Sequence, residues 1–158
     1  MSGRNLPYDA GSVFAVPLPS GAFAIGVVAL TNDKGLILGY FFGPPQPDVE
    51  SVGGQIAVLC ADKADYVARA GDLGLIEGKW PVVGEIPKWN QVEWPLPEFR
   101  FVDPLFHKSY RTIYERVDDT GRRVPAAVEE IASLPEDGVA GAGFVEKRLG
   151  RLLETNVD

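Results

Sequence analysis

Cysteine and histidine are almost absent from this chain. Its 158 residues include one cysteine, Cys60, and one histidine, His107. A single cysteine cannot form an internal disulfide, so the chain is not a disulfide-stapled secreted domain. A structural zinc site needs four cysteine or histidine ligands, which these two residues cannot supply. We therefore expect no Cys/His metal site.

Recognisable cofactor motifs are missing as well. The sequence contains no G-x-x-x-x-G-K-[ST] loop, no G-x-G-x-x-G between a strand and a helix, and no D-x-D-x-D-G loop. A site for Mg²⁺ or Ca²⁺ made only of carboxylates remains open. Our expectation is that the protein binds no cofactor.

The shortage of histidine also leaves little room for nucleophilic catalysis. His107 is accompanied by Asp103 and Ser109, but all three belong to one turn-like segment. A catalytic triad needs its members to converge from separate elements around a cleft. We interpret His107 as an exposed turn residue and predict that the protein is not an enzyme.

Charge is absent from one long segment, residues 10–32. Pro17, Pro19, Ser20 and Gly21 interrupt it in the middle, which a membrane-spanning helix tolerates poorly. No basic region precedes it, as a signal peptide would require. We interpret the segment as a β-hairpin and expect a cytoplasmic protein that does not bind membranes.

Acidic side chains outnumber basic ones. The chain has 22 acidic and 15 basic residues, for a net charge of −7. This balance repels nucleic acid and anionic membranes, and it accelerates encounter with a basic protein. Moderate acidity also serves solubility alone, so both interpretations stay open.

The sequence is rich in turn-forming residues, with 18 glycines and 13 prolines. This composition favours short strands joined by tight turns over long helices. Alternating apolar residues predict an antiparallel meander of strands over 12–18, 22–30 and 36–42, with a bulge or a bend of the curling sheet at Gly26. A loop is expected over 43–55.

The rest of the chain predicts further strands and then helices. Strands or extended segments are expected at 56–60, 64–70, 91–97, 98–102 and 110–117. The glycines of segment 71–84 oppose a stable helix, and Pro81 limits any pairing there to a sheet edge. Helical spacing predicts one helix beginning at Pro125 and a second over 144–153, with Val145, Leu149 and Leu152 on one face.

These elements predict an α+β fold. We expect a curved, mostly antiparallel sheet that forms a partial barrel, with two C-terminal helices. No linker divides the chain, so 1–158 is expected to be a single domain with a β-rich part at 11–117 and a helical part at 122–155.

Three tryptophans, Trp80, Trp89 and Trp94, fall within fifteen residues, each close to a proline and among acidic side chains. They either pack irregular segments onto the sheet or form an interaction surface. Packing is the preferred interpretation for Trp80 and Trp94. The two interpretations are equally favoured for Trp89, whose neighbours are more polar.

Two stretches resemble a known family. Residues 11–28 have the form G-x-V-F-x-x-P-L-x-x-G-x-[YF]-x-x-G-x-V, and residues 71–84 read GDLGLIEGKWPVVG, followed by Trp89 and by Trp94-Pro95. Together they resemble the immunity protein 26 family of bacterial polymorphic toxin systems, over roughly residues 11–117. The resemblance implies a cytoplasmic protein that binds one cognate toxin domain and blocks it without catalysis.

The acidic balance makes a basic nuclease a suitable target for such an inhibitor. The resemblance does not identify any residues that bind the toxin, so the interface is our own prediction. It comprises Asp72, Glu77, Glu85 and Trp89, with a second acidic patch of Asp118, Asp119, Glu129 and Glu130.

Two other functions remain as alternatives. One is a small barrel-like module that binds a peptide or small ligand, with Tyr40, Phe42 and Tyr114 lining a deep pocket. The other is a carboxylate-based hydrolase, which would need two converging carboxyl groups and a strongly raised pKa on one of them. The sequence leaves the oligomeric state undetermined.

Overall fold

The computed structural model describes residues 5–154. Positions 1–4 and 155–158 of the expected single domain lie outside the described residues. The strands are β1 (Ser12–Pro17), β2 (Phe23–Thr31), β3 (Leu36–Gln46), β4 (Tyr66–Gly71), β5 (Val82–Glu85), β6 (Phe99–Val102), β7 (Ser109–Ile113), β8 (Arg122–Pro125) and β9 (Val139–Ala140). The helices are α1 (Val49–Gly53), α2 (Leu73–Ile76), α3 (Val128–Ile131) and α4 (Ala142–Glu154), with 3₁₀ turns at Ile56–Val58, Ala61–Lys63 and Gln91–Glu93.

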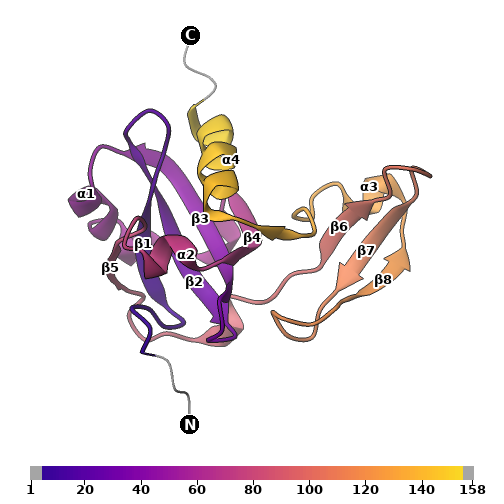
Figure 1. Cartoon of the computed structure of the whole chain (residues 1–158), viewed down its shortest axis with the longest axis horizontal. Coiled ribbons are helices and arrows are strands. Elements are labelled where there is room, and N and C mark those ends of the chain that lie inside the picture. The colour runs from indigo at the N-terminus through magenta and orange to yellow at the C-terminus, as the bar shows by residue number, and fades with distance from the viewer. Residues whose placement is uncertain (1–4, 155–158) are drawn as a thin grey trace.

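The strands form two sheets. Six strands in the order β5-β1-β2-β3-β4-β9 make the larger sheet, and β6-β7-β8 make the smaller one. Every pair is antiparallel except β4 with β9. Figure 1 shows the smaller sheet projecting away from the larger one. We call residues 98–134 the arm, and the larger sheet with α1, α2 and α4 the body.

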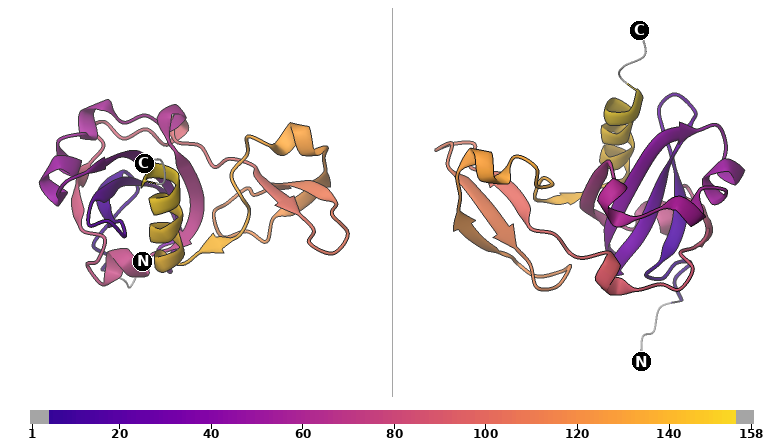
Figure 2. Two further views of the ribbon diagram at one scale, coloured as in Figure 1. Left: turned by 90° about the horizontal axis from the view of Figure 1, so that it is seen from above. Right: turned by 180° about the vertical axis from the view of Figure 1, so that it is seen from behind.

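The larger sheet curves around α4, which lies against its concave face (Figure 2). The expected meander of β1, β2 and β3 is confirmed, and so is the hairpin interpretation of the uncharged segment 10–32. In the described residues the sheet has free edges at β5 and β9 and does not close into a barrel. The expected α+β fold with a curved, mostly antiparallel sheet is therefore confirmed.

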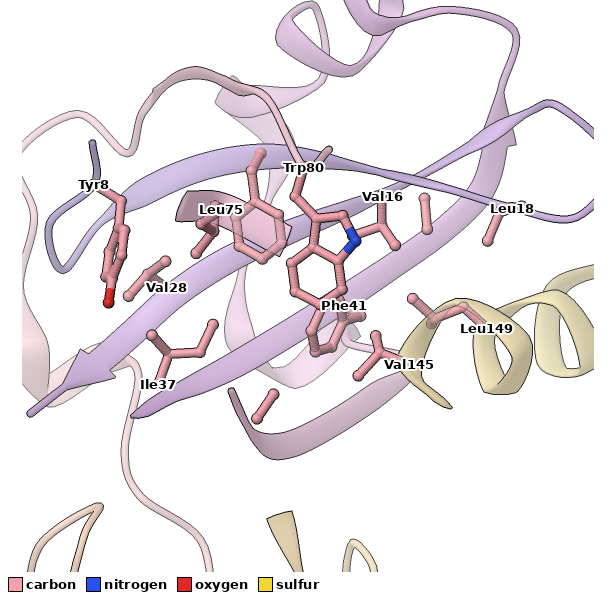
Figure 3. Packing of buried hydrophobic residues seen from close by; sticks show 13 residues of the cluster. Tyr8, Val16, Leu18, Val28, Ile37, Phe41, Leu75, Trp80, Val145 and Leu149 are labelled. Atoms are coloured by element: carbon pink, nitrogen blue, oxygen red, sulfur yellow. The ribbon is translucent and has the colours of Figure 1, made fainter. Parts of the chain in front are cut away.

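Trp80 lies at the centre of the core on the concave face. Its ring stacks on Phe14 at 5.4 Å between centroids and meets the ring of Phe41 edge-on at 6.2 Å. Val145 and Leu149 of α4 point into the same cluster (Figure 3). The indole N–H donates a hydrogen bond to Oε2 of Glu146 at 2.9 Å, which satisfies its one polar group.

Gly26 makes room for an aromatic ring in the curved sheet, and of the two expected features, a bulge or a bend, no bulge occurs at it. It pairs in register with Phe14 on β1 and Phe41 on β3, and the register shifts of β2 occur on either side of it. A Cβ atom at this position would lie 2.3 Å from Cζ of Phe14. The glycine therefore permits the close approach of the ring that stacks on Trp80.

A second core covers the convex face of the same sheet. Trp94 is its largest member, and Tyr40 meets the Trp94 ring edge-on at 5.2 Å while its hydroxyl donates to the carbonyl of Pro95. The loop carrying Trp94 thus packs irregular chain onto the sheet. The preferred packing interpretation of Trp80 and Trp94 is confirmed, with exposed fractions of 0% and 2%.

A buried polar network joins the arm to the body. Arg69 on β4 donates to the hydroxyl of Tyr114 at 2.8 Å and to the carbonyl of Val117 at 3.2 Å, and its guanidinium stacks on the Tyr114 ring. The same guanidinium lies 3.6 Å from the carboxylate of Asp137. These contacts link β4 of the body with residues that follow β7 and precede β9.

Several local predictions are wrong. Segments 56–60 and 91–97 contain 3₁₀ turns instead of extended chain, and segment 71–84 does contain a helix, the four-residue α2. Pro125 ends a strand instead of beginning a helix, and α3 starts three residues later. Within α4, Val145 and Leu149 are buried as expected, but Leu152 is largely exposed. Short apolar runs have no periodicity long enough to distinguish these outcomes.

Candidate functional site

Asp72 lies inside the body, although it was predicted to be a surface contact. Its residue is 6% exposed, and its carboxylate accepts a 2.7 Å hydrogen bond from the hydroxyl of Tyr8. Its backbone N–H donates to the carbonyl of Gly35. Asp72 therefore holds the N-terminal segment and the β2–β3 turn together at the start of α2.

Glu77 and Glu85 are exposed on the body, and in the sequence they lie before and after the buried Trp80. Glu77 follows α2 and lies 3.3 Å from Nζ of Lys79, while Glu85 ends the edge strand β5. The Glu77–Lys79 pair is exposed on both sides, so it contributes little to stability and leaves the carboxylate free for other partners.

Trp89 is half-buried and covers the beginning of β1. Its ring stacks on Trp94 with centroids 5.7 Å apart. A Cβ atom added to Gly11 would lie only 3.0 Å from the nearest carbon of the Trp89 ring. Gly11 has a φ of +94°, so the close contact and the backbone conformation both require glycine there. One part of the indole thus packs and the remainder stays accessible to a partner.

A shallow hollow of about 740 Å³ lies beside β5, where α1 crosses the edge of the sheet. Its lining residues are Phe23, Asp48, Val49, Glu50, Gly53 and Val83, which include two acidic residues and no basic one. The Ser51 backbone N–H and the Ser51 hydroxyl both donate to the Asp48 carboxylate and lower its pKa below the ordinary value. Sequence reasoning missed this hollow because segment 43–55 was expected to be a loop. The aspartate before Val49, which caps α1, was the available signal.

The second predicted acidic patch lies on the arm, and most of its carboxylates have local partners. Asp119 accepts hydrogen bonds from two backbone N–H groups in its turn, and it forms an ion pair with Arg116, as Asp118 also does. Glu130 accepts the backbone N–H of Ala127 at 2.8 Å and caps α3. Glu129 is exposed. The structure therefore places the two predicted groups on different parts of the molecule.

The segment that carries His107 is the turn between β6 and β7. The Asp103 carboxylate accepts the backbone N–H groups of Leu105 and Phe106, at 2.8 and 3.3 Å. That carboxylate is therefore occupied by the backbone of its own turn. Sequence reasoning missed that Leu105 and Phe106 are 80% and 70% exposed. The signal in the sequence was a pair of adjacent apolar residues placed between turn-forming residues.

Asp137 has the most elaborate carboxylate environment in the described residues. Burial by itself would raise its pKa, but hydrogen bonds from Tyr114, Thr112, the Gly138 N–H and Arg123 outweigh it, so the pKa is lowered. Burial, together with the hydrogen bond to Asp137, raises the pKa of Tyr114 to about 12. The clearly shifted carboxyl groups, Asp48, Asp62 and Asp137, all have lowered pKa values. A general acid would need a shift in the opposite direction.

The aromatic residues expected to line a ligand pocket are part of the core. Tyr40, Phe42 and Tyr114 are at most 9% exposed and pack on the convex face of the sheet. Two hollows of about 320 and 270 Å³ share Tyr66 and Glu136; the first lies on the body beside β9, and the second lies between body and arm. Neither includes the three expected residues in its lining, so the basis for the ligand-binding alternative is wrong.

Two features are absent from residues 5–154. No described helix is long and apolar enough to cross a membrane. Within the same residues, no three histidine, cysteine, aspartate or glutamate side chains are grouped so that they could hold a metal ion.

The structure is that of an α+β protein with a partly hollowed body and a projecting arm. Residues 9–111 match the sequence pattern of the family described as Immunity protein 26. The chain therefore belongs to the immunity protein 26 family. Neither the curated proteins nor the solved structures include a significant match to it.

Proposed function

We propose that this protein neutralises a cognate toxin domain in the cytoplasm by binding it, without catalysis, and that the toxin is a basic nuclease of a polymorphic toxin system. The observation that carries the proposal is membership of the immunity protein 26 family over residues 9–111. An immunity protein needs a surface that recognises one toxin and no catalytic centre of its own.

The distribution of charge supports a basic target. The arm contains six basic and seven acidic residues, whereas the rest of the chain contains nine basic and fifteen acidic ones. Nearly all of the net charge of −7 therefore belongs to sequence outside the arm. A nuclease must attract phosphate groups, so its substrate groove is basic and would be drawn to this acidic surface.

We place the electrostatic contact on the β5 side of the body. Glu77 and Glu85 are exposed there, Trp89 offers part of its ring, and Asp48 and Glu50 line the hollow beside β5. The apolar floor of the hollow, which includes Phe23 and Val83, would bury apolar atoms of the toxin next to the charged contacts. The arm residues Asp118, Asp119, Glu129 and Glu130 are a secondary candidate, since local partners already occupy most of them.

Co-expression tests the proposal. The DNA beside this gene should encode a large exported protein that ends in a compact basic domain. Expressing that domain alone should stop growth of a host cell, and co-expressing this protein should restore growth. The purified proteins should form a stable complex by size-exclusion chromatography. Toxicity that persists despite soluble expression of both proteins would contradict the proposal.

Charge reversal tests the placement of the contact. Replacing both Glu77 and Glu85 with lysine should lower the association rate roughly tenfold at low ionic strength, because steering depends on local charge. The effect should shrink as salt is added. A matched control replaces Asp62 and Glu115, which are exposed and lie outside both predicted acidic groups, with lysine and changes the net charge equally. Equal effects of the two double variants would show that only net charge matters.

A further inference from the structure

The hollow beside β5 is an apolar groove whose lining also contains two carboxylates. Phe23, Val49 and Val83 pack against the convex-face core and keep part of their side chains exposed in the groove. Asp48 and Glu50, at the start of α1, are exposed and add the two charges. Figure 1 shows α1 and β5 on the side of the body that faces away from the arm. We call this groove the β5 hollow.

Helix α1 and the carboxylate of Asp48 have fixed positions on the sheet. Val52 of α1 is fully buried in the convex-face core and fastens the helix there. The backbone N–H and the hydroxyl of Ser51 both donate to Oδ1 of Asp48 at 2.8 Å, which leaves Oδ2 without a partner among the described residues. An acceptor that is already held in place loses little conformational entropy when a donor binds to it.

The charges of the β5 hollow are not neutralised by the chain itself. Neither Asp48 nor Glu50 forms an ion pair within residues 5–154. Residues 35–62, which include α1, contain no lysine or arginine. The hollow therefore repels an anionic partner, and a symmetric contact with a second copy would bring the same carboxylates of two chains together. Its charge favours a cationic occupant.

Two arginines inside this chain show which cation suits a ring next to a carboxylate. The guanidinium of Arg69 lies 3.9 Å from the ring centroid of Tyr114 and 3.6 Å from the carboxylate of Asp137. The guanidinium of Arg123 lies 3.6 Å from the ring centroid of Phe101 and 3.4 Å from the same carboxylate. A planar guanidinium can stack on a ring while its N–H groups reach an acceptor. The β5 hollow has a ring and carboxylates but no arginine in its lining.

We propose that the β5 hollow receives one arginine side chain of the toxin domain. The inference rests on the proposed function and names the group that this side of the body recognises. The aliphatic stem of the arginine would cover Val49 and Val83 while its guanidinium stacks on Phe23. Asp48 and Glu50 would accept the guanidinium N–H groups. A seated and desolvated charge pair acts mainly on the lifetime of a complex, so this contact would slow dissociation.

A steric variant tests whether the hollow is occupied, without changing the charge. A Cβ atom added to Gly53 would lie 3.8 Å from Cβ of Val83, an ordinary contact, so α1 can carry a side chain there. Gly53→Leu should fill the hollow and speed dissociation of the toxin domain encoded beside this gene, in a catalytically inactivated form, about 30-fold or more. Surface plasmon resonance measures the rate. The matched control Gly54→Leu adds the same side chain at an exposed position outside the lining and should change the rate less than about twofold.

A charge variant examines the two carboxylates, and it keeps the proposal testable if Gly53→Leu does not fold. Asp48→Asn combined with Glu50→Gln removes both charges, and the asparagine still offers an oxygen to cap α1. Dissociation should become about tenfold faster or more, because the arginine loses its acceptors of opposite charge. The control Asp62→Asn combined with Glu115→Gln removes two exposed charges elsewhere and should leave the dissociation rate unchanged.

A double-mutant cycle identifies the occupant. Each exposed arginine of the toxin domain is replaced with alanine, and its effect on affinity is measured against the unaltered protein and against the charge variant. For one arginine the effect should be at least about tenfold smaller with the charge variant, and replacing that arginine with lysine should not restore the affinity. Cycles in which no arginine is coupled to the hollow, or in which only a lysine is, would overturn the proposal.

The outcomes separate the two proposals. If the unaltered protein neither binds the toxin domain nor protects cells, the proposed function fails and the inference falls with it. If it binds and protects, but Gly53→Leu and the charge variant dissociate as slowly as the unaltered protein, only the inference is overturned. Sedimentation velocity distinguishes another occupant: a dimer that Gly53→Leu abolishes, with toxin binding unchanged, would assign the hollow to a second copy of this chain.

Discussion

The body and the arm differ in how much apolar surface each encloses. Ten of the twelve largest fully buried side chains belong to the body, including Trp80, Phe14 and Phe41, whereas the arm contributes Phe99 and Ile131. At its junction with the body, the arm adds the polar contacts of Arg69 with Tyr114 and Asp137 to the apolar packing of Phe99 and Val117 in the convex-face core. Dense apolar packing makes the body a rigid platform, while the position of the arm is sensitive to single charged groups.

The largest expected effect is the loss of the central ring of the body. Trp80→Ala should lower the free energy of unfolding by about 4 kcal/mol, because it removes a fully buried indole and its contacts with two phenylalanine rings. Urea denaturation followed by circular dichroism measures it. Trp80→Phe should cost clearly less, and a loss below about 1 kcal/mol in the alanine variant would contradict the packing described here.

The junction should respond next most strongly. Arg69→Ala leaves the carbonyl of Val117 without its partner and removes the cation beside Asp137, which should cost about 3 kcal/mol. Hydrogen exchange should show faster opening of arm amides than of body amides. The control Arg123→Ala removes an arginine that also contacts Asp137 but is about half exposed, and should cost less than about 1 kcal/mol. Uniform exchange across the chain would mean that arm and body unfold together.

Overfilling the body core tests its rigidity. Gly26→Ala places a Cβ about 2.3 Å from Cζ of Phe14, a ring held between Trp80 and Phe41, and should cost about 2 kcal/mol. Gly143→Ala is the matched control in α4, where nothing lies within 4 Å, and should be neutral or slightly stabilising. Thermal unfolding of both variants checks the difference. Similar melting temperatures would show that the Phe14 ring moves freely.

A smaller effect should depend on pH. The pKa of Asp137 is lowered in the folded state, so its carboxylate adds stability above the unfolded pKa of about 3.9, and that stability is lost as the pH falls through the folded value. Asp137→Asn should therefore be less stable than the unaltered protein at pH 7, with the difference shrinking towards pH 3. Glu115→Gln, an exposed control, should show no such trend. A difference independent of pH would contradict the role of the charge.

The smallest effect is expected at the turn between β6 and β7. Replacing Leu105 and Phe106 with serine should change the free energy of unfolding by less than about 0.5 kcal/mol, because both side chains are largely exposed. Chemical denaturation under the conditions used for Trp80→Ala provides the comparison. A loss above about 1 kcal/mol would indicate that these side chains pack against the chain and are not free for a partner.

Much of the body could be predicted from the sequence, whereas the details of the arm could not. Alternation in segments 12–18 and 22–30 located β1 and β2 within one residue of their observed ends, and segment 36–42 located the start of β3, which runs four residues further than predicted. The arm consists of four-residue and five-residue elements, too short for a period to be counted, so a strand replaced the expected start of a helix at Pro125. Among the predicted interface residues, Asp72 is buried because Tyr8, 64 residues away in sequence, reaches its carboxylate.

Local pattern and turn chemistry by themselves determined the antiparallel meander, the edge position of the strand after Pro81 and the burial of Trp80 and Trp94. Those features depend on neighbouring residues, whose preferences can be read along the chain. Only the tertiary structure decided that Arg69 meets Tyr114 and Asp137, that α1 completes an acidic hollow beside β5, and that Leu105 and Phe106 remain uncovered. Each of these depends on segments distant in sequence or on the absence of a covering segment, and no local preference encodes where such segments come to lie.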